Sequence, residues 1–175
     1  MPRVTSETGW DSATSGSTLD YQGKSITLVY LDGFKRGWAY TFIYEMVDAQ
    51  GSTGNQGLYD ASNVAKPAAT FVHNMTTILQ DTTNFAPGQL NYSIPSEPAT
   101  VHDMLLQKSN GTFYLVIWDE QTTTSTTDNI TVTLGTPHTV TEYDATVGTS
   151  PVATFTSATS IPLTLSDHAV ILAIP

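Results

Sequence analysis

The pattern of apolar residues changes along the chain, and this change limits the fold more than any other feature of the sequence. Up to about residue 86 the sequence alternates between strand and helix patterns, whereas later residues form short apolar runs separated by turn-forming residues. The first pattern is typical of a parallel sheet covered by helices, and the second is typical of an antiparallel sandwich. We therefore predict an α+β chain with two domains, 1–86 and 87–175.

The first domain is predicted to hold two strands and two helices in alternation. Residues 38–44 form a nearly unbroken apolar and aromatic run, as in a strand that is buried on both faces. Apolar residues at helical spacing predict one helix over residues 25–36, which ends at Gly37, and a second from Pro67 to about Leu79. A short β-like stretch near residues 3–6 precedes the first helix.

The second domain is predicted to be built from seven or eight short strands. Asn110-Gly111 lies between two apolar runs, which is the strongest short-range signal for a hairpin. Residues 130–134 alternate apolar and Thr side chains, and residues 122–127 are expected to form a polar loop. Four further strands are expected, at 138–143, 152–155, 161–165 and 169–174.

The composition excludes several classes of function. Acids outnumber bases 16 to 6, for a formal charge of -10, whereas nucleic acids and anionic membranes are bound mainly through Lys and Arg. We therefore expect no nucleic acid and no membrane as partners. The chain has no cysteine, and its four histidines show no metal-ligand spacing, so we expect no metal site. The start of the sequence shows no signal-peptide pattern.

A carboxylate at the end of the short β-like stretch is the first candidate for chemistry. Glu7 is followed by Thr8-Gly9-Trp10, and the C-terminal ends of strands line the active site of an α/β barrel. A carboxylate there could attack an anomeric carbon, while the indole of Trp10 stacks on a sugar ring. On spacing alone, the simpler interpretation of Glu7 is an exposed acid in a frayed terminus.

The segment Val4-Thr5-Ser6-Glu7-Thr8-Gly9-Trp10 resembles the end of the seventh strand in the retaining TIM-barrel glycoside hydrolases of clan A, which include β-glucanases and cellulases. Trp38-Ala39-Tyr40-Thr41-Phe42-Ile43-Tyr44-Glu45 resembles the eighth strand, and Lys66-Pro67-Ala68-Ala69 resembles the approach to the last barrel helix. Some of these families have Pro after the Trp, where this sequence has Asp11. The resemblance implies a partial (β/α) barrel segment, its last two βα units, followed by an antiparallel β-sandwich.

The resemblance also implies roles for five residues. Glu7 would be the catalytic nucleophile, and the substrate-binding residues would be Trp10, Tyr44, Glu45 and Asp48. The substrate would be a β-linked polysaccharide or oligosaccharide, no cofactor would be needed, and the enzyme would act in an extracellular or periplasmic location.

Two parts of such an enzyme are not found in the sequence. Retaining hydrolysis needs a second carboxyl about 5 to 5.5 Å from the first, and a barrel takes about 250 residues. No Asn-Glu pair, which carries the acid/base in the resembled clan, occurs here. We therefore expect the chain to be a C-terminal fragment, inactive alone and able to self-associate through exposed barrel edges.

A second class of function stays open at this stage. The chain could be a non-catalytic β-sandwich module that binds carbohydrate or protein, with the first domain a degenerate barrel remnant. Its aromatic candidates would be Tyr92, Tyr114 and Trp118. A strand could equally bury these three side chains as core.

Overall fold

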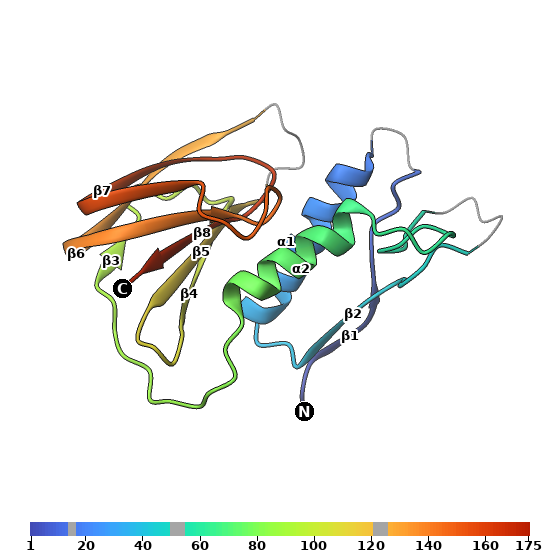
Figure 1. The fold of residues 1–175 in the computed structure, drawn as a ribbon, viewed down its shortest axis with the longest axis horizontal. Helices are drawn as coiled ribbons and strands as arrows, with labels where there is room; N and C mark the ends of the chain where they lie inside the picture. The colour runs from blue at the N-terminus through green and yellow to red at the C-terminus, as the bar shows by residue number, and fades with distance from the viewer. Residues whose placement is uncertain (14–16, 50–54, 121–125) are drawn as a thin grey trace. The chain divides into compact units, whose positions relative to one another are not determined.

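The computed structural model describes residues 1–13, 17–49, 55–120 and 126–175 (Figure 1). The chain divides into two compact units, Met1–Met75 (unit 1) and Thr76–Pro175 (unit 2). The division falls inside the second helix, whereas the sequence suggested a boundary after residue 86. No helix among the described residues is long and apolar enough to cross a membrane.

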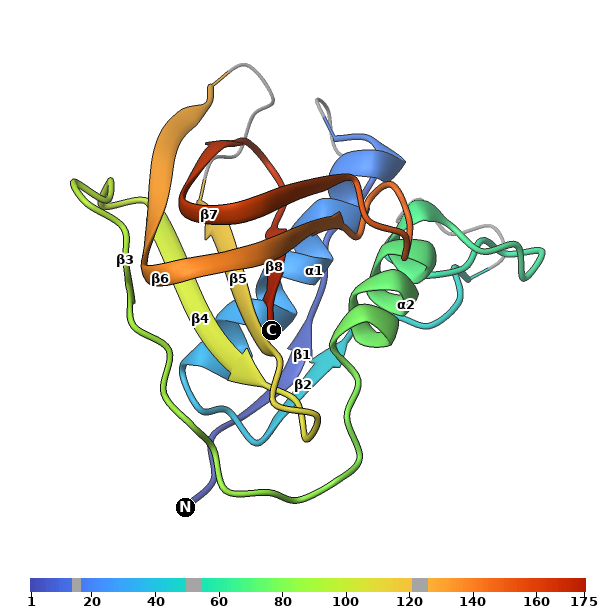
Figure 2. The ribbon, with the colours of Figure 1, turned by 60° about the vertical axis from the view of Figure 1, so that its left-hand side comes forward.

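Unit 1 has the predicted order of strand, helix, strand and helix. Its elements are β1 (Val4–Thr8), α1 (Leu19–Lys35), β2 (Tyr40–Ile43) and the part of α2 (Pro67–Leu79) up to Met75. The strands β1 and β2 pair in parallel, as expected for a βαβ unit (Figure 2). The prediction for α2 is confirmed from its first residue to its last.

The helix α1 begins six residues before the start that we predicted. Thr18 is its N-cap, and the Thr18 hydroxyl accepts a hydrogen bond from the Tyr21 backbone N–H at 3.0 Å. Asp20 adds a negative charge in the first turn, which favours a helix start. At the other end Gly37 takes a positive φ of 70°, so the predicted stop is confirmed.

The prediction that β2 is buried on both faces is wrong. Its exposure alternates, and the side chains of Tyr40 and Phe42 are 64% and 54% exposed and stack on each other. Thr41 points the other way, toward Gly33 of α1. One face of the two-stranded sheet is therefore covered by a helix, and the other presents large aromatic side chains to solvent, an arrangement that usually marks an interaction surface.

The helices α1 and α2 approach each other closely at Gly23. A Cβ atom at this position would lie 2.7 Å from the Phe71 ring and 2.9 Å from the Ala68 backbone nitrogen. Glycine thus permits a helix contact that any other residue would obstruct.

We expect Gly23→Ala to lower the free energy of unfolding by about 1 to 3 kcal/mol, because the overpacked contact outweighs the gain in helix propensity. Chemical denaturation followed by circular dichroism would measure the change. Gly148→Ala is the matched control, since a Cβ there meets nothing within 4 Å, and its effect should stay within about 0.5 kcal/mol. A neutral or stabilising Gly23→Ala would contradict the close packing.

Unit 2 is an antiparallel sheet of six strands. In chain order they are β3 (Tyr92–Ser93), β4 (Val101–Gln107), β5 (Phe113–Asp119), β6 (Asp128–Asp144), β7 (Ala153–Leu165) and β8 (Val170–Ile174). The hairpin predicted at Asn110-Gly111 joins β4 to β5, with Gly111 at a φ of 93°. Residues 122–125 of the polar loop expected over 122–127 lie outside the described residues.

The predicted sandwich is a single sheet that curls over itself. The first half of β6 pairs with β3 and β7, and its second half pairs with both β7 and β8. Two predicted strands merge in β6 because the chain runs through Gly135-Thr136-Pro137 without reversing, at a shift in the β6–β7 register. Glycine and proline in a strand often mark such an irregularity.

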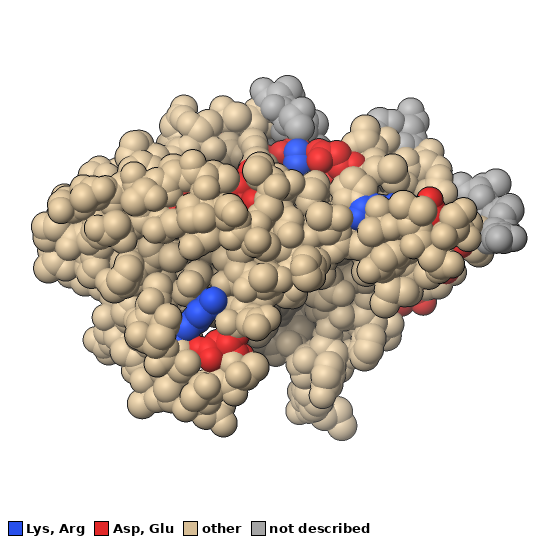
Figure 3. Space-filling view, in the orientation of Figure 1, with Lys and Arg blue, Asp and Glu red and all other residues tan. Residues whose placement is uncertain are grey.

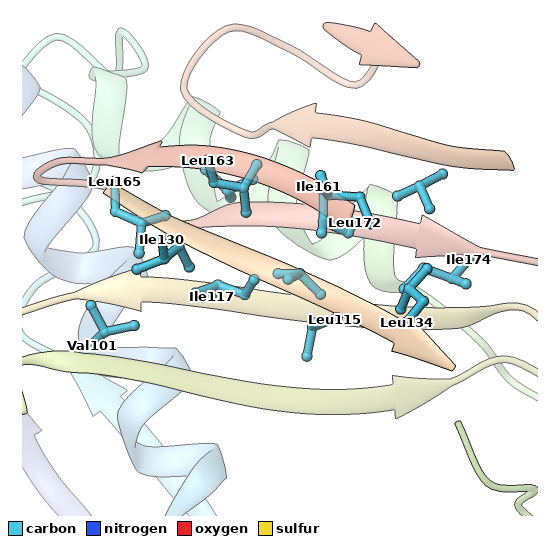
Figure 4. Close-up of a cluster of buried hydrophobic side chains, with 13 residues drawn as sticks. Val101, Leu115, Ile117, Ile130, Leu134, Ile161, Leu163, Leu165, Leu172 and Ile174 are labelled. Atoms are coloured by element: carbon cyan, nitrogen blue, oxygen red, sulfur yellow. The ribbon is translucent and has the colours of Figure 1, made fainter. Parts of the chain in front are cut away.

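The core of unit 2 lies inside this curl (Figure 4). Its side chains come from alternate positions of β5, β6, β7 and β8, as the two-residue period of a strand requires, and from Val101 at the start of β4. The buried cluster consists of Val101, Leu115, Ile117, Ile130, Val132, Leu134, Val140, Ile161, Leu163, Leu165, Val170, Leu172 and Ile174.

Candidate active site

A β-bulge in β1 decides which way Glu7 points. Thr5 pairs with Thr41 and Thr8 pairs with Ile43, so Ser6 and Glu7 together lie opposite the single residue Phe42. Such a bulge re-aims a side chain. Because Thr41 and Ile43 are on the face toward α1, Thr8 is also, and the preceding Glu7 falls on the open face that carries Phe42.

The ends of β1 and β2 are held against each other just after Glu7. The Tyr44 backbone N–H donates to the Thr8 carbonyl oxygen at 2.6 Å. Gly9 passes so close that a Cβ atom there would lie 2.2 Å from the Tyr44 carbonyl oxygen. The Tyr44–Glu45 peptide bond is cis. The structure thus brings Glu7, Tyr44 and Glu45 to the same end of the parallel sheet.

Glu45 lies in a segment that is held in place by backbone hydrogen bonds. Its carbonyl oxygen accepts from the Leu58 N–H at 3.0 Å, and the next carbonyl, of Met46, accepts from the Tyr59 N–H at 2.9 Å. These hydrogen bonds pair the segment after β2 with residues 56–59. The side chain of Glu7 is exposed and that of Glu45 is partly exposed, so both carboxylates can reach a ligand.

Trp10 lies in the segment between β1 and α1. Its indole makes an edge-to-face contact with Tyr21, with 5.3 Å between ring centroids, and its Nε1 donates to the Ser17 hydroxyl at 3.2 Å. The indole remains partly exposed. It is therefore oriented by α1 while keeping surface on which a sugar ring could stack.

Gln22, which was not predicted as a site residue, links this segment to the one after β2. The side chain is fully buried, and its Nε2 donates to the carbonyl oxygens of Trp10 and Asn55, each at 2.8 Å. Asp11 makes a second link, because its carboxylate accepts from the Ala13 and Asn55 backbone N–H groups, which lowers its pKa. The available signal was a polar residue one turn before the buried Ile26 on α1.

We expect Gln22→Leu to lower the free energy of unfolding by about 2 kcal/mol, because two partly buried backbone carbonyl oxygens lose the hydrogen bonds that the fully buried Gln22 side chain donates. Denaturant unfolding measures this loss, and hydrogen exchange should show faster exchange around residues 10–13 and 55–57. Gln22→Glu tests the same link, since a carboxylate cannot donate and should be at least as harmful. Unchanged exchange in both variants would show that the link is unimportant.

Asp48 is placed in the interior and not on the open face. It is 7% exposed, its Oδ2 lies 2.5 Å from the Nζ of Lys66, itself 5% exposed, and its Oδ1 accepts from the Gly57 N–H at 2.6 Å. Both carboxylate oxygens are therefore engaged by protein groups. The structure points to a role in linking Asp48 to Lys66 and Gly57, and it gives no surface on Asp48 for a direct sugar contact.

The three aromatic residues considered for a carbohydrate-binding module are engaged within unit 2. Trp118 is fully buried, and the Tyr92 hydroxyl donates to the Asp103 carboxylate. The Nζ of Lys108 lies over the Tyr114 ring, 4.4 Å from its centroid. The described residues also contain no group of three or more His, Asp or Glu side chains that could hold a metal ion.

No protein-family model and no curated protein sequence matches the chain. Solved structures do match it. A family 39 glycoside hydrolase from the gut symbiont Bacteroides cellulosilyticus WH2 superposes with a TM-score of 0.69 and 16% identity, over 100% of this chain and 34% of that chain. CelM2, a bifunctional glucanase-xylanase from a metagenome library, gives a TM-score of 0.57 and 14% identity, over 100% and 31%.

The chain therefore spans about a third of the length of these solved chains. Sequence identities of 14 to 16% support a similarity of fold and nothing further. Over its full length, the fold of the chain is similar to that of a portion of each of these two glycoside hydrolases.

Proposed function

We propose that the chain is the C-terminal part of a retaining glycoside hydrolase that acts on β-linked polysaccharide, with Glu7 as the nucleophile. The observation that carries the proposal is the position of Glu7, on the open face of a parallel sheet and beside the strand end that bears Tyr44 and Glu45. Carboxyl ends of parallel strands form the active sites of barrels. The fold likeness to portions of two glycoside hydrolases supports the same conclusion.

In the proposed reaction the Glu7 carboxylate attacks the anomeric carbon and forms a glycosyl ester, which water then hydrolyses. The Tyr44 hydroxyl donates a hydrogen bond near the nucleophile, and Trp10 or Tyr44 stacks on the sugar. Glu45 accepts hydrogen bonds from sugar hydroxyls. Asp48 contributes indirectly, because its contacts with Lys66 and Gly57 hold the segment after β2 in place. No cofactor takes part.

The second carboxyl must come from outside this chain in this proposal. Each of β1 and β2 has one strand neighbour among the described residues, and their open face exposes Tyr40 and Phe42. Further parallel strands would cover both the unpaired edges and this face. Without them the chain would be inactive and would self-associate through the same edges.

A neutral ligand fits the low charge content of the chain, in which 13% of the residues are charged. The face shown in Figure 3 carries only scattered charged side chains among a large uncharged surface. Neutral sugars are recognised by hydrogen bonds and stacking, which need no net charge. An extracellular or periplasmic setting, where polysaccharide is found, belongs to the same proposal.

A chimera would test the proposed function. This chain replaces the matching third of the family 39 hydrolase, and the product is assayed on aryl β-glycosides and labelled with a 2-deoxy-2-fluoro glycoside. Hydrolysis together with a mass label on Glu7 would support the proposal. A folded chimera that is labelled on another carboxylate would refute it. Glycan binding by residues 89–175 alone would favour a binding module instead.

A further inference from the structure

His168 bridges two parts of unit 2 through both of its ring nitrogens. It lies in the turn between β7 and β8, where its Nε2 is 3.2 Å from Asp144 Oδ2 and its Nδ1 is 3.2 Å from Asp167 Oδ1. Asp144 is the last residue of β6 and pairs with Val170, the first residue of β8. The imidazole therefore joins the end of β6 to the turn that starts β8.

The groups that face this ring are acidic or neutral. Asp144 also accepts hydrogen bonds from the backbone N–H and the hydroxyl of Thr146, at 2.8 and 2.7 Å. Glu142, on β6, lies near enough to Asp144 to feel its charge. The Ser166 hydroxyl lies 3.2 Å from His168 Nδ1, but that nitrogen also faces the Asp167 carboxylate and so carries a proton. The trio of Ser166, His168 and Asp144 is therefore no nucleophile–base pair.

We propose that His168 is a pH-dependent clasp, which ties the β7–β8 turn to the end of β6 as an imidazolium and loosens it when the proton is lost. An imidazolium donates from both nitrogens, whereas a neutral imidazole donates from one only. Loss of the proton therefore removes the hydrogen bond from the imidazole to one of the two carboxylates. Unit 2 is held most firmly on the acidic side of neutrality.

The direction of the pKa shifts agrees with the geometry. The hydrogen bond to Asp144 raises the pKa of His168 above 6.5, although burial opposes it. Burial alone would raise the pKa of Asp144, but the hydrogen bonds from His168 and Thr146 bring it down to about 2. Stability from the raised His168 pKa is complete below 6.5 and is lost as the pH rises through the folded value. Stability from the lowered pKa of Asp144 is complete above 3.8 and is lost as the pH falls from there through the folded pKa of about 2.

Glu142 adds to the same trend. Its burial and the nearby Asp144 charge raise its pKa, so its contribution also weakens as the pH rises above 4.5. The effect of His168 must therefore be measured as the difference in stability between the wild type and a variant without the imidazole. His168→Gln is the suitable variant, because a glutamine amide can still donate but does not titrate.

The experiment compares the melting temperature of the full chain and of His168→Gln from pH 5 to pH 9. The wild type should melt several degrees higher at pH 5, and this difference should shrink steadily as the pH rises. His73→Gln removes an exposed imidazole of unit 1 and is the control, and its pH profile should lie closer to that of the wild type than the profile of His168→Gln. Parallel profiles for the wild type and His168→Gln would overturn the proposal.

A second measurement covers the case in which His168→Gln fails to fold. The imidazole of His168 is titrated in the wild-type chain by NMR, with assignment through labelled histidine. An apparent pKa above the ordinary value, which falls in Asp144→Asn, supports the clasp. Titration at or below the ordinary value overturns it, because the ring would then be neutral where the clasp requires a charge.

Discussion

Replacing Glu7 by glutamine in the chimera is expected to lower kcat by several orders of magnitude. The amide is similar in size but is a poor nucleophile, so the glycosyl ester cannot form. Glu7→Ala removes the group altogether and leaves room for a small anion. Added azide should then restore turnover of an activated aryl glycoside and give a glycosyl azide of inverted anomeric configuration. Kinetics and product analysis by NMR measure both effects.

Neighbouring residues supply the controls for this prediction. Tyr44→Phe removes one hydrogen bond near the nucleophile and should lower kcat by about 100-fold, a loss that azide does not repair. Glu45→Gln should act mainly on KM, because the proposed contact is with sugar hydroxyls. If Glu7→Gln stays active while Glu45→Gln does not, the nucleophile has been assigned to the wrong carboxylate.

The sequence predicts the first unit well where local signals are strong. Pro67 and the apolar positions that follow it define α2 from end to end, and Gly37 marks the end of α1. The start of α1 was missed because Thr18, its N-cap, lies beside other hydroxyl residues, so several positions could have capped a helix. An apolar run does not show whether other elements cover one face of a strand or both faces. The prediction that β2 is buried on both faces was therefore wrong.

Most of the structural features that could not be predicted from the sequence depend on long-range contacts. Gly135-Thr136-Pro137 has the composition of a turn, yet β6 continues through it because β7 follows the same bend across a shift in register. The bulge at Ser6 and Glu7 exists only in relation to the pairing with β2. The structural roles of Gln22 and of the pair of Asp48 and Lys66 likewise depend on contacts with residues that are far away in the sequence.

Removing one charge of the buried pair between Asp48 and Lys66 should be the most destabilising single change in unit 1. In Asp48→Asn the Lys66 ammonium would stay buried without its counter-charge, at a cost of about 3 to 5 kcal/mol. That is a large part of the 5 to 15 kcal/mol that stabilises a typical domain. Hydrogen exchange measured by mass spectrometry would follow unit 1 directly, and we expect faster exchange over residues 45–49 and 55–66.

The partner variants separate the buried charge from the packing around it. Lys66→Met should cost less than Asp48→Asn, because Asp48 keeps the hydrogen bond from the Gly57 N–H. The double variant Asp48→Asn/Lys66→Met leaves no buried charge and should recover much of the loss, since neutral groups of similar volume can replace a buried ion pair at little cost. Additive losses in the double variant would mean that the two side chains act independently.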